Sequence, residues 1–145
     1  MPQKQVTVTA TLGDGFVMES QIGAHSILID QPKEAGGTDT GPNPLQYFLL
    51  SVAGCMGAVG RIIANQKKLN VRHINVQVKG DLNTDGLLGK AVDGRVGFDS
   101  IAVSVDIDAD LSAQEKQAFL EEIEARCPIA DNIVNTTSVS VQLQA

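Results

Sequence analysis

An apolar segment from Asn43 to about Leu69 constrains the fold of this chain more than any other feature. Asn43, Pro44 and Gln46 predict a helix start, because they supply an N-cap, a proline at the first helical position and a capping-box partner. Apolar residues then lie on nearly every side of the predicted helix: Leu45, Phe48, Leu49, Leu50, Val52, Ala53, Met56, Val59, Ile62 and Ile63. A helix of this kind is buried on several sides, so we expect it at the centre of the fold.

Three glycines, Gly54, Gly57 and Gly60, interrupt this helix, and each should lower its stability by about 1 kcal/mol relative to alanine. They indicate a close neighbour, either another backbone or the same helix in a second copy of the chain. The uncharged stretch from Tyr47 to Gly60 is about 14 residues long, below the 18 or more expected of a membrane span. We therefore expect a buried core helix and no membrane partner.

Alternating apolar and polar residues predict strands on both sides of the helix. The expected strands cover residues 6–12, 16–22, 25–30, 74–78, 101–107 and 139–143, with a Gly- and Pro-rich loop over 31–42 and an unassigned segment over 80–100. Ser112 and Glu115 form a second capping box and open a helix that Pro128 ends, and a short helical turn is expected over 129–134. The pattern predicts a single α+β domain over residues 1–145.

Charge and composition narrow the function. The chain has a net charge of −6, no Trp, one Tyr and four Phe, so it lacks the basic surface and the stacking side chains of nucleic-acid-binding proteins. Two cysteines are too few for a secreted disulfide framework, and the N-terminus has no signal region. We expect a cytoplasmic protein with free thiols and no nucleic-acid partner.

The two cysteines occupy different settings. Cys127 directly precedes Pro128 at an expected helix start, where the helix dipole and the neighbouring Arg126 favour the thiolate. Cys55 lies within the apolar helix. Arg61 lies about 9 Å further along that helix and about 120° around it, too far for direct pairing with Cys55. Either cysteine is also compatible with an inert, buried thiol.

Other chemistry has weaker support in the sequence. His25 and His73 together with the cysteines have none of the short spacings typical of zinc sites, so no metal is expected. A nucleophilic Cys–His pair stays open, because such partners meet in space. Dinucleotide, P-loop and serine-hydrolase motifs are missing from the chain, and no cofactor is expected.

Four segments together resemble one known family. They are His25–Asp30, the run Gly36–Pro44, the helical Ala53-Gly54-Cys55, and Arg126-Cys127-Pro128-Ile129. In this order they resemble the OsmC/Ohr family, named for osmotically inducible protein C and organic hydroperoxide resistance protein. The Gly36–Pro42 run and Arg61 look closest to an OsmC-like subgroup that also occurs fused to hydrolase domains.

This resemblance implies a fold and an activity. The fold is an intertwined homodimer in which antiparallel sheets wrap two long central helices, with active sites at the interface. The activity is thiol-dependent reduction of organic hydroperoxides in oxidative stress. Cys55 would be the peroxidatic thiol, Cys127 the resolving thiol, and an external dithiol the reductant.

The chain departs from the family pattern at two positions. It has no arginine before Arg61, and Leu45 and Gln46 stand where family members carry a glutamate. Without a cation, burial raises the pKa of a thiol and slows its attack. Two alternatives to the peroxidase therefore stay open. One is a non-peroxidatic dimer that binds a small apolar or electrophilic ligand at the interface, and the other is a cysteine-based hydrolase or transferase.

Overall fold

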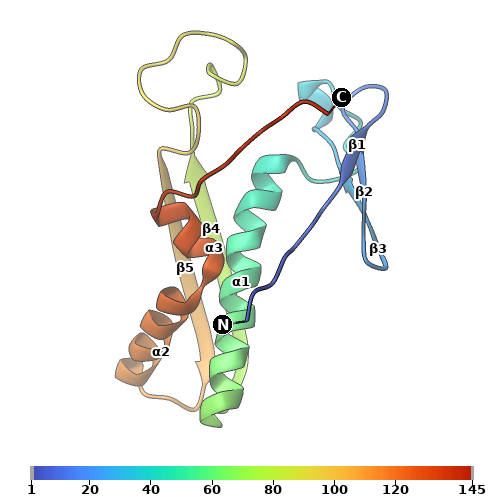
Figure 1. Cartoon of the computed structure of the whole chain (residues 1–145). Helices are drawn as coiled ribbons and strands as arrows, with labels where there is room; N and C mark the ends of the chain where they lie inside the picture. Colours follow the sequence, from blue (N-terminus) through green and yellow to red (C-terminus); the bar gives the residue numbers. More distant parts are fainter. Residues whose placement is uncertain (1, 145) are drawn as a thin grey trace. The chain divides into compact units, whose positions relative to one another are not determined.

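The computed structural model of the protein describes residues 2–144, and the chain divides into two compact units between Phe48 and Leu49. The element order is mixed, with three strands before a long helix, then two strands and two further helices (Figure 1). This confirms the predicted α+β class with antiparallel sheets and a long helix. A single domain over the whole chain stays a prediction.

The first unit contains a three-stranded antiparallel sheet in the order β1-β2-β3. The strands are β1 (Ala10–Leu12), β2 (Met18–Ile22) and β3 (His25–Ile29). Gly23 has a φ of 59° in the β2–β3 turn, a conformation that glycine adopts without strain. The strand predicted over 6–12 is only three residues long, because residues 6–9 form no ladder with a neighbouring strand.

A buried carboxylate organises the loop after β3, which contains the short 3-10 helix η1 (Lys33–Ala35). Asp30 accepts hydrogen bonds from the main-chain N–H groups of Gln31, Thr38 and Thr40 and from the hydroxyls of both threonines, at 2.7 to 3.2 Å. The Thr38 hydroxyl and the other donors hold the pKa of this carboxyl well below its usual range. Gly37 is required there, because a Cβ would lie 2.0 Å from the Gln31 carbonyl oxygen.

The loop leads into α1 (Pro44–Lys67), whose start has the predicted capping box. The Asn43 N–H donates to Gln46 Oε1 and the Gln46 N–H donates to Asn43 Oδ1, both at 2.9 Å. The Tyr47 hydroxyl donates to the carbonyl oxygen of Leu28 on β3 at 2.8 Å. The first turn of α1 is therefore held to the sheet of the first unit.

The second unit packs α1 against a two-stranded sheet and two helices. These are β4 (Val71–Asp81), β5 (Ser100–Ala109), α2 (Ala113–Arg126) and α3 (Pro128–Val134). Cross-strand pairs such as Ile74 with Ile107 present apolar side chains toward the core. The buried core consists of Val52, Met56, Val59, Ile63, Ala64, Val71, Ile107, Ala109, Phe119, Ile123 and Cys127.

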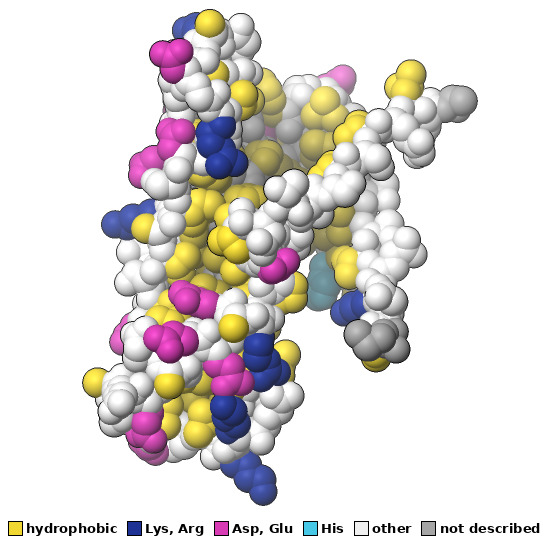
Figure 2. Space-filling model, turned by 60° about the vertical axis from the view of Figure 1, so that its left-hand side comes forward, with side chains coloured by type: hydrophobic (Ala, Val, Ile, Leu, Met, Phe, Trp, Pro, Cys, Tyr) yellow, Lys and Arg dark blue, Asp and Glu magenta, His cyan; other side chains and the backbone are white. Residues whose placement is uncertain are grey.

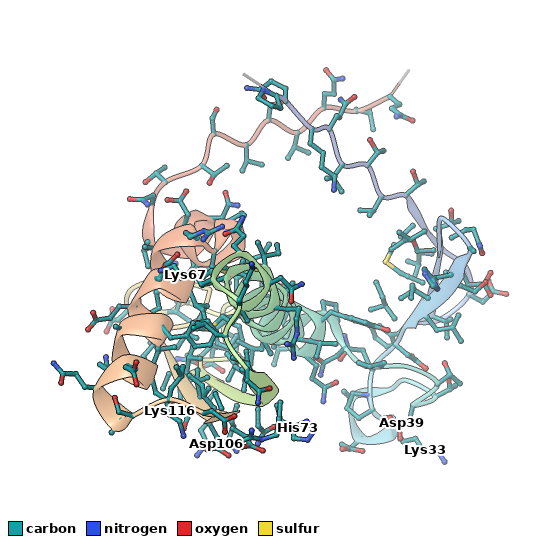
Figure 3. The ribbon with its side chains drawn as sticks, turned by 90° about the horizontal axis from the view of Figure 1, so that it is seen from below. Lys33, Asp39, Lys67, His73, Asp106 and Lys116 are labelled. Atoms are coloured by element: carbon teal, nitrogen blue, oxygen red, sulfur yellow. The ribbon has the colours of Figure 1, made fainter. Side chains whose placement is uncertain are left out.

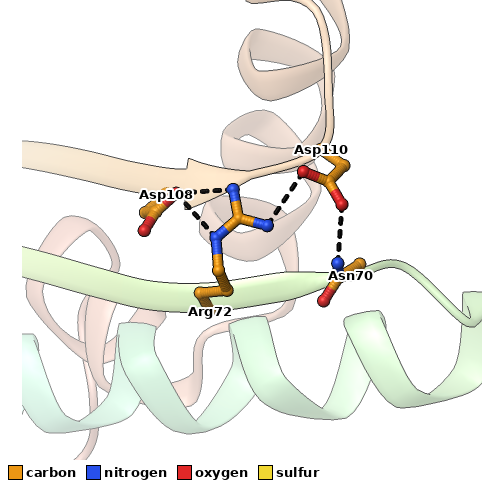
Figure 4. Close-up of polar contacts among 4 residues, drawn as sticks. All are labelled: Asn70, Arg72, Asp108 and Asp110. Atoms are coloured by element: carbon orange, nitrogen blue, oxygen red, sulfur yellow. Dashed lines mark hydrogen bonds and ion pairs between the residues drawn. The ribbon is translucent and has the colours of Figure 1, made fainter.

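Arg72 joins the two strands of this sheet at a bulge in β4. Its guanidinium donates to Asp108 at 2.7 and 3.0 Å and to Asp110 at 2.8 Å, and Asn70 donates to the other oxygen of Asp110 (Figure 4). These hydrogen bonds lower the pKa of both carboxyls. All of these side chains are exposed, so the network orders the surface and contributes little to stability.

Several apolar side chains of the second unit stay exposed. The predicted closing strand over 139–143 is wrong for this structure, because those residues form no ladder with any described strand. Val139, Val141 and Leu143 are between 78% and 99% exposed. The segment between β4 and β5 also exposes Leu87 and Leu88. Figure 2 shows hydrophobic side chains gathered at the surface between charged groups at either end of that face.

The length argument against a membrane span does not hold for α1. The helix has 24 residues and a mean hydropathy of 1.7 over its best 18-residue window, so by length and composition it could cross a membrane. Its residues Val52, Met56, Val59, Ile63 and Ala64 nevertheless belong to the buried core of the second unit. This supports a core helix, and the absence of a membrane partner stays a prediction.

Candidate active site

Cys55 lies on α1 about three turns after its start. Its side chain is half-buried and packs against the core of the second unit, beside the buried Met56. The apolar residues that make α1 a core helix therefore also place this thiol at the core boundary. Such a position leaves the sulfur partly accessible while its surroundings are largely apolar.

Cys127 lies at the junction of two helices. It ends α2 and serves as the N-cap of α3, with extended backbone angles (φ −82°, ψ 111°), and Pro128 occupies the first turn of α3. Its Sγ accepts a hydrogen bond from the Ala130 N–H at 3.4 Å. The side chain is 2% exposed, so the second thiol is much less accessible than Cys55.

The fold brings the two sulfurs together although the residues are 72 apart in sequence. Cys127 Sγ lies 2.9 Å from Cys55 Sγ, and both are free thiols. A disulfide between them needs a further approach of about 0.9 Å, to the S–S bond length of about 2.05 Å. The spacing in sequence contained no information about this contact.

The electrostatics of the pair disfavour the Cys55 thiolate within one chain. Burial raises the pKa of Cys55, and so does its side-chain hydrogen bond with Cys127. The main-chain N–H of Ile129 acts in the opposite direction by hydrogen bonding to Cys55. The N–H groups of Ile129 and Ala130 were not predicted individually, although a cysteine before a proline at a helix start points to such donors.

Arg126 was expected to favour the Cys127 thiolate, but its guanidinium is directed toward other partners. Its guanidinium donates to Glu122 at 2.9 Å and to the Gln66 side chain at 3.0 Å. Lys67 binds the other oxygen of Glu122 at 2.5 Å. The expectation failed because a side chain this long is directed by its hydrogen-bonding partners on α1 and α2, and adjacency in sequence does not decide its direction.

The remaining candidate residues lie away from the sulfurs or have structural roles. Gln46 completes the capping box of α1, and Leu45 is exposed. Arg61 is exposed and has no hydrogen bond or ion pair to any residue that the structure describes.

Both histidines are exposed strand residues. His73 pairs with Asp108 in the β4–β5 register, and its exposed side chain points away from α1 (Figure 3). His25 is exposed at the start of β3 in the first unit. Within residues 2–144, no three His, Cys, Asp or Glu side chains are grouped to hold a metal ion. Within the second unit, the two sulfurs contact each other and accept hydrogen bonds from N–H groups at the start of α3.

This arrangement is suited to thiol–disulfide chemistry. An oxidant that reaches the half-buried Cys55 would find the second thiol in contact with the first. A sulfenic acid formed on one sulfur is then attacked by its neighbour before further oxidation. The contact between Cys55 and Cys127 is the geometric requirement for this chemistry.

The chain is similar to known proteins of one family over most of its length. The OsmC-like protein family matches residues 37–142, which include both cysteines. A hydroperoxide reductase from Mycoplasma pneumoniae is 23% identical over 141 residues, covering 97% of this chain and 94% of that protein.

Solved structures show the same fold. An OsmC-like protein from Mycoplasma pneumoniae superposes with a TM-score of 0.80 at 24% identity, over 93% of this chain and 91% of that chain. An organic hydroperoxide resistance protein OsmC from Legionella pneumophila superposes with a TM-score of 0.65 at 21% identity, over 92% and 91% of the two chains.

Proposed function

This chain belongs to the OsmC-like protein family, and from that premise we propose that it is a thiol-dependent peroxidase that reduces organic hydroperoxides. The observation that carries the proposal is the 2.9 Å contact between Cys55 and Cys127. Its similarity to a hydroperoxide reductase over nearly the whole chain supports the same activity. The chain would act in oxidative stress, in a reducing cytoplasm that keeps both thiols free.

The reaction takes three steps. The Cys55 thiolate attacks the O–O bond of the hydroperoxide, forming a sulfenic acid on Cys55 and releasing the alcohol after proton transfer. The Cys127 thiol attacks that sulfur, forming a disulfide and releasing water. An external dithiol then reduces the disulfide by exchange and is itself oxidised.

The difference in accessibility supports the proposed roles of the two thiols. Cys55 is half-buried, whereas Cys127 is 2% exposed, so a hydroperoxide reaches Cys55 first. Cys127 is also held at the start of α3 by the Ala130 N–H, already in contact with Cys55. Cys55 is therefore the peroxidatic thiol and Cys127 the resolving thiol in this proposal.

The test is thiol titration and intact mass of the reduced protein before and after stoichiometric cumene hydroperoxide, with hydrogen peroxide in parallel. We expect rapid loss of both thiols to an intramolecular disulfide, with faster loss for the organic peroxide. Cys127→Ser should stop at a sulfenic acid, and Cys55→Ser should not react. Survival of both thiols in excess cumene hydroperoxide would exclude a peroxidase.

A second candidate is a dimer without peroxidase activity that binds a small apolar or electrophilic ligand. One observation favours it: burial raises the pKa of Cys55, and no cationic side chain contacts the sulfur within the described residues. In that case both thiols survive cumene hydroperoxide but Cys55 still reacts with an apolar electrophile such as N-ethylmaleimide. A Cys55→Ser variant provides the control for that labelling.

We also propose that the working form is a homodimer. The exposed apolar side chains of the second unit, among them Leu50 at 60% and Ile62 at 49%, are surfaces that a second copy would cover. Sedimentation of the reduced protein should give twice the mass of one chain. A species of single-chain mass at micromolar concentration would exclude the dimer.

A further inference from the structure

The contact between Cys55 and Cys127 depends on how α2 is held against α1, because the two residues come from different elements. Cys127 directly follows α2, and Ile123 lies four residues before it, one helical turn away on the same side of α2. Gly60 lies five residues after Cys55 on α1. All four residues belong to the second unit. The sulfur contact therefore has a second contact between the same two helices close to it, at Gly60 and Ile123.

Gly60 has no room for a side chain. It is buried, and a Cβ built on it would lie 2.6 Å from Ile74 Cδ1 on β4 and 3.2 Å from Ile123 Cδ1 on α2. The next atom is Phe119 Cζ at 3.7 Å, which is an ordinary van der Waals distance. The terminal methyl groups of the two isoleucines thus fill the space that any larger residue at position 60 would need.

Packing explains a glycine that the helix itself does not favour. Glycine lowers the stability of a helix interior relative to alanine. Protein cores are packed about as densely as organic crystals, so an added methyl group forces its neighbours to move. A methyl group at position 60 would push Ile123, and α2 with it, away from α1. Because Cys127 follows α2 one turn after Ile123, it would move away from Cys55.

The cysteine pair is sensitive to such a displacement. The two sulfurs lie 2.9 Å apart and must approach by about 0.9 Å more to form a bond. Cys127 is also held on both sides, since its N–H donates to the Glu124 carbonyl oxygen and its Sγ accepts from the Ala130 N–H. A wider spacing between α1 and α2 would therefore oppose the disulfide.

We infer that Gly60 is a positioning residue for the cysteine pair, because the absence of a side chain lets Ile123 pack on α1 and brings Cys127 into contact with Cys55. Gly60 acts through Ile123 and α2. Its role in the reaction rests on the proposed peroxidase, in which a resolving thiol at contact distance converts the sulfenic acid to a disulfide before further oxidation.

The test is the equilibrium between the Cys55–Cys127 dithiol and its disulfide in buffers of reduced and oxidised glutathione. The two protein thiols are oxidised to one disulfide, and one glutathione disulfide is reduced to two thiols. Acid quenching, alkylation and intact mass give the ratio of the two protein forms. Gly60→Ala should lower the equilibrium constant for the disulfide about tenfold, which raises its reduction potential by about 30 mV. A value equal to that of the parent overturns the inference.

Two further variants separate the spacing of the helices from a general loss of stability. Changing isoleucine to valine removes the Cδ1 methyl group. Gly60→Ala/Ile74→Val relieves the closer of the two contacts, so it should fold while the new methyl group still presses on α2, and its equilibrium constant should lie below that of the parent. Adding Ile123→Val should restore most of the loss, because the nearest listed atom left is Phe119 Cζ at 3.7 Å. A loss that persists in the triple variant overturns the inference.

Ser112→Ala is the control, because it removes the cap at the other end of α2 and adds no volume between the helices. It should lower the urea midpoint and leave the glutathione equilibrium unchanged. A shift as large as that of Gly60→Ala would show that any weakening of α2 has the same effect, and it would overturn the inference. Because this equilibrium requires no hydroperoxide, these outcomes are independent of the peroxidase proposal.

Discussion

At the scale of single residues, Asp30 orders the loop before α1, because its carboxylate accepts hydrogen bonds from N–H and hydroxyl groups across that loop. Its pKa is lowered in the folded state, so its contribution is complete above the unfolded pKa of about 3.9 and is lost as the pH falls below that value. We predict that Asp30→Asn lowers the NMR hydrogen-exchange protection of the Thr38 and Thr40 amides at pH 6 by about tenfold or more.

The control for this prediction is Asp39→Asn, because Asp39 lies in the same loop with a positive φ of 55° that asparagine also tolerates. This variant should keep wild-type protection. The difference between Asp30→Asn and the wild type should shrink as the pH is lowered from 5 toward 3. A difference of constant size over that range would show that the charge of Asp30 is not responsible.

At the scale of elements, α2 positions Cys127, since the helix ends at that residue. The Ser112 side chain accepts from the Glu115 N–H at 3.1 Å, and Glu115 accepts from the Ser112 N–H at 2.8 Å. We predict that Ser112→Ala lowers the free energy of unfolding by about 1 kcal/mol, measured by urea denaturation, because it leaves the Glu115 N–H without a partner. Ser112→Asp should restore most of the loss, and an equal loss in both variants would contradict a capping role.

At the scale of the whole molecule, a disulfide between Cys55 and Cys127 would link α1 to the junction of α2 and α3 and close a loop of 72 residues. The chain-entropy relation gives about 4 kcal/mol for a loop of that length. We predict that the oxidised protein unfolds at a higher urea concentration than the reduced protein at the same chain concentration. The urea midpoint of Cys127→Ser should be the same under oxidising and reducing conditions. If the midpoint of the wild-type protein also does not depend on the redox state, the disulfide is contradicted.

The capping boxes and the alternating segments show how far local patterns predict the fold. The capping boxes at Asn43 and Ser112 were recognised from four residues each, and both are present. The alternation over 74–78 and 101–107 predicted two strands, and the structure extends both as β4 and β5. The same alternating pattern predicted a strand over 139–143, and that prediction was wrong. A strand also needs a neighbouring strand as its hydrogen-bonding partner, and the alternation of residues does not show whether one is present.

The sequence by itself determined the class of the fold, the long helix with its capping box, and the two cysteines as candidates, because each of these depends on residues adjacent along the chain or on composition. Only the tertiary structure decided that Cys127 contacts Cys55 and that Arg126 turns to Glu122. Those facts depend on how separate elements pack, and packing directs side chains toward partners that are far away in the sequence.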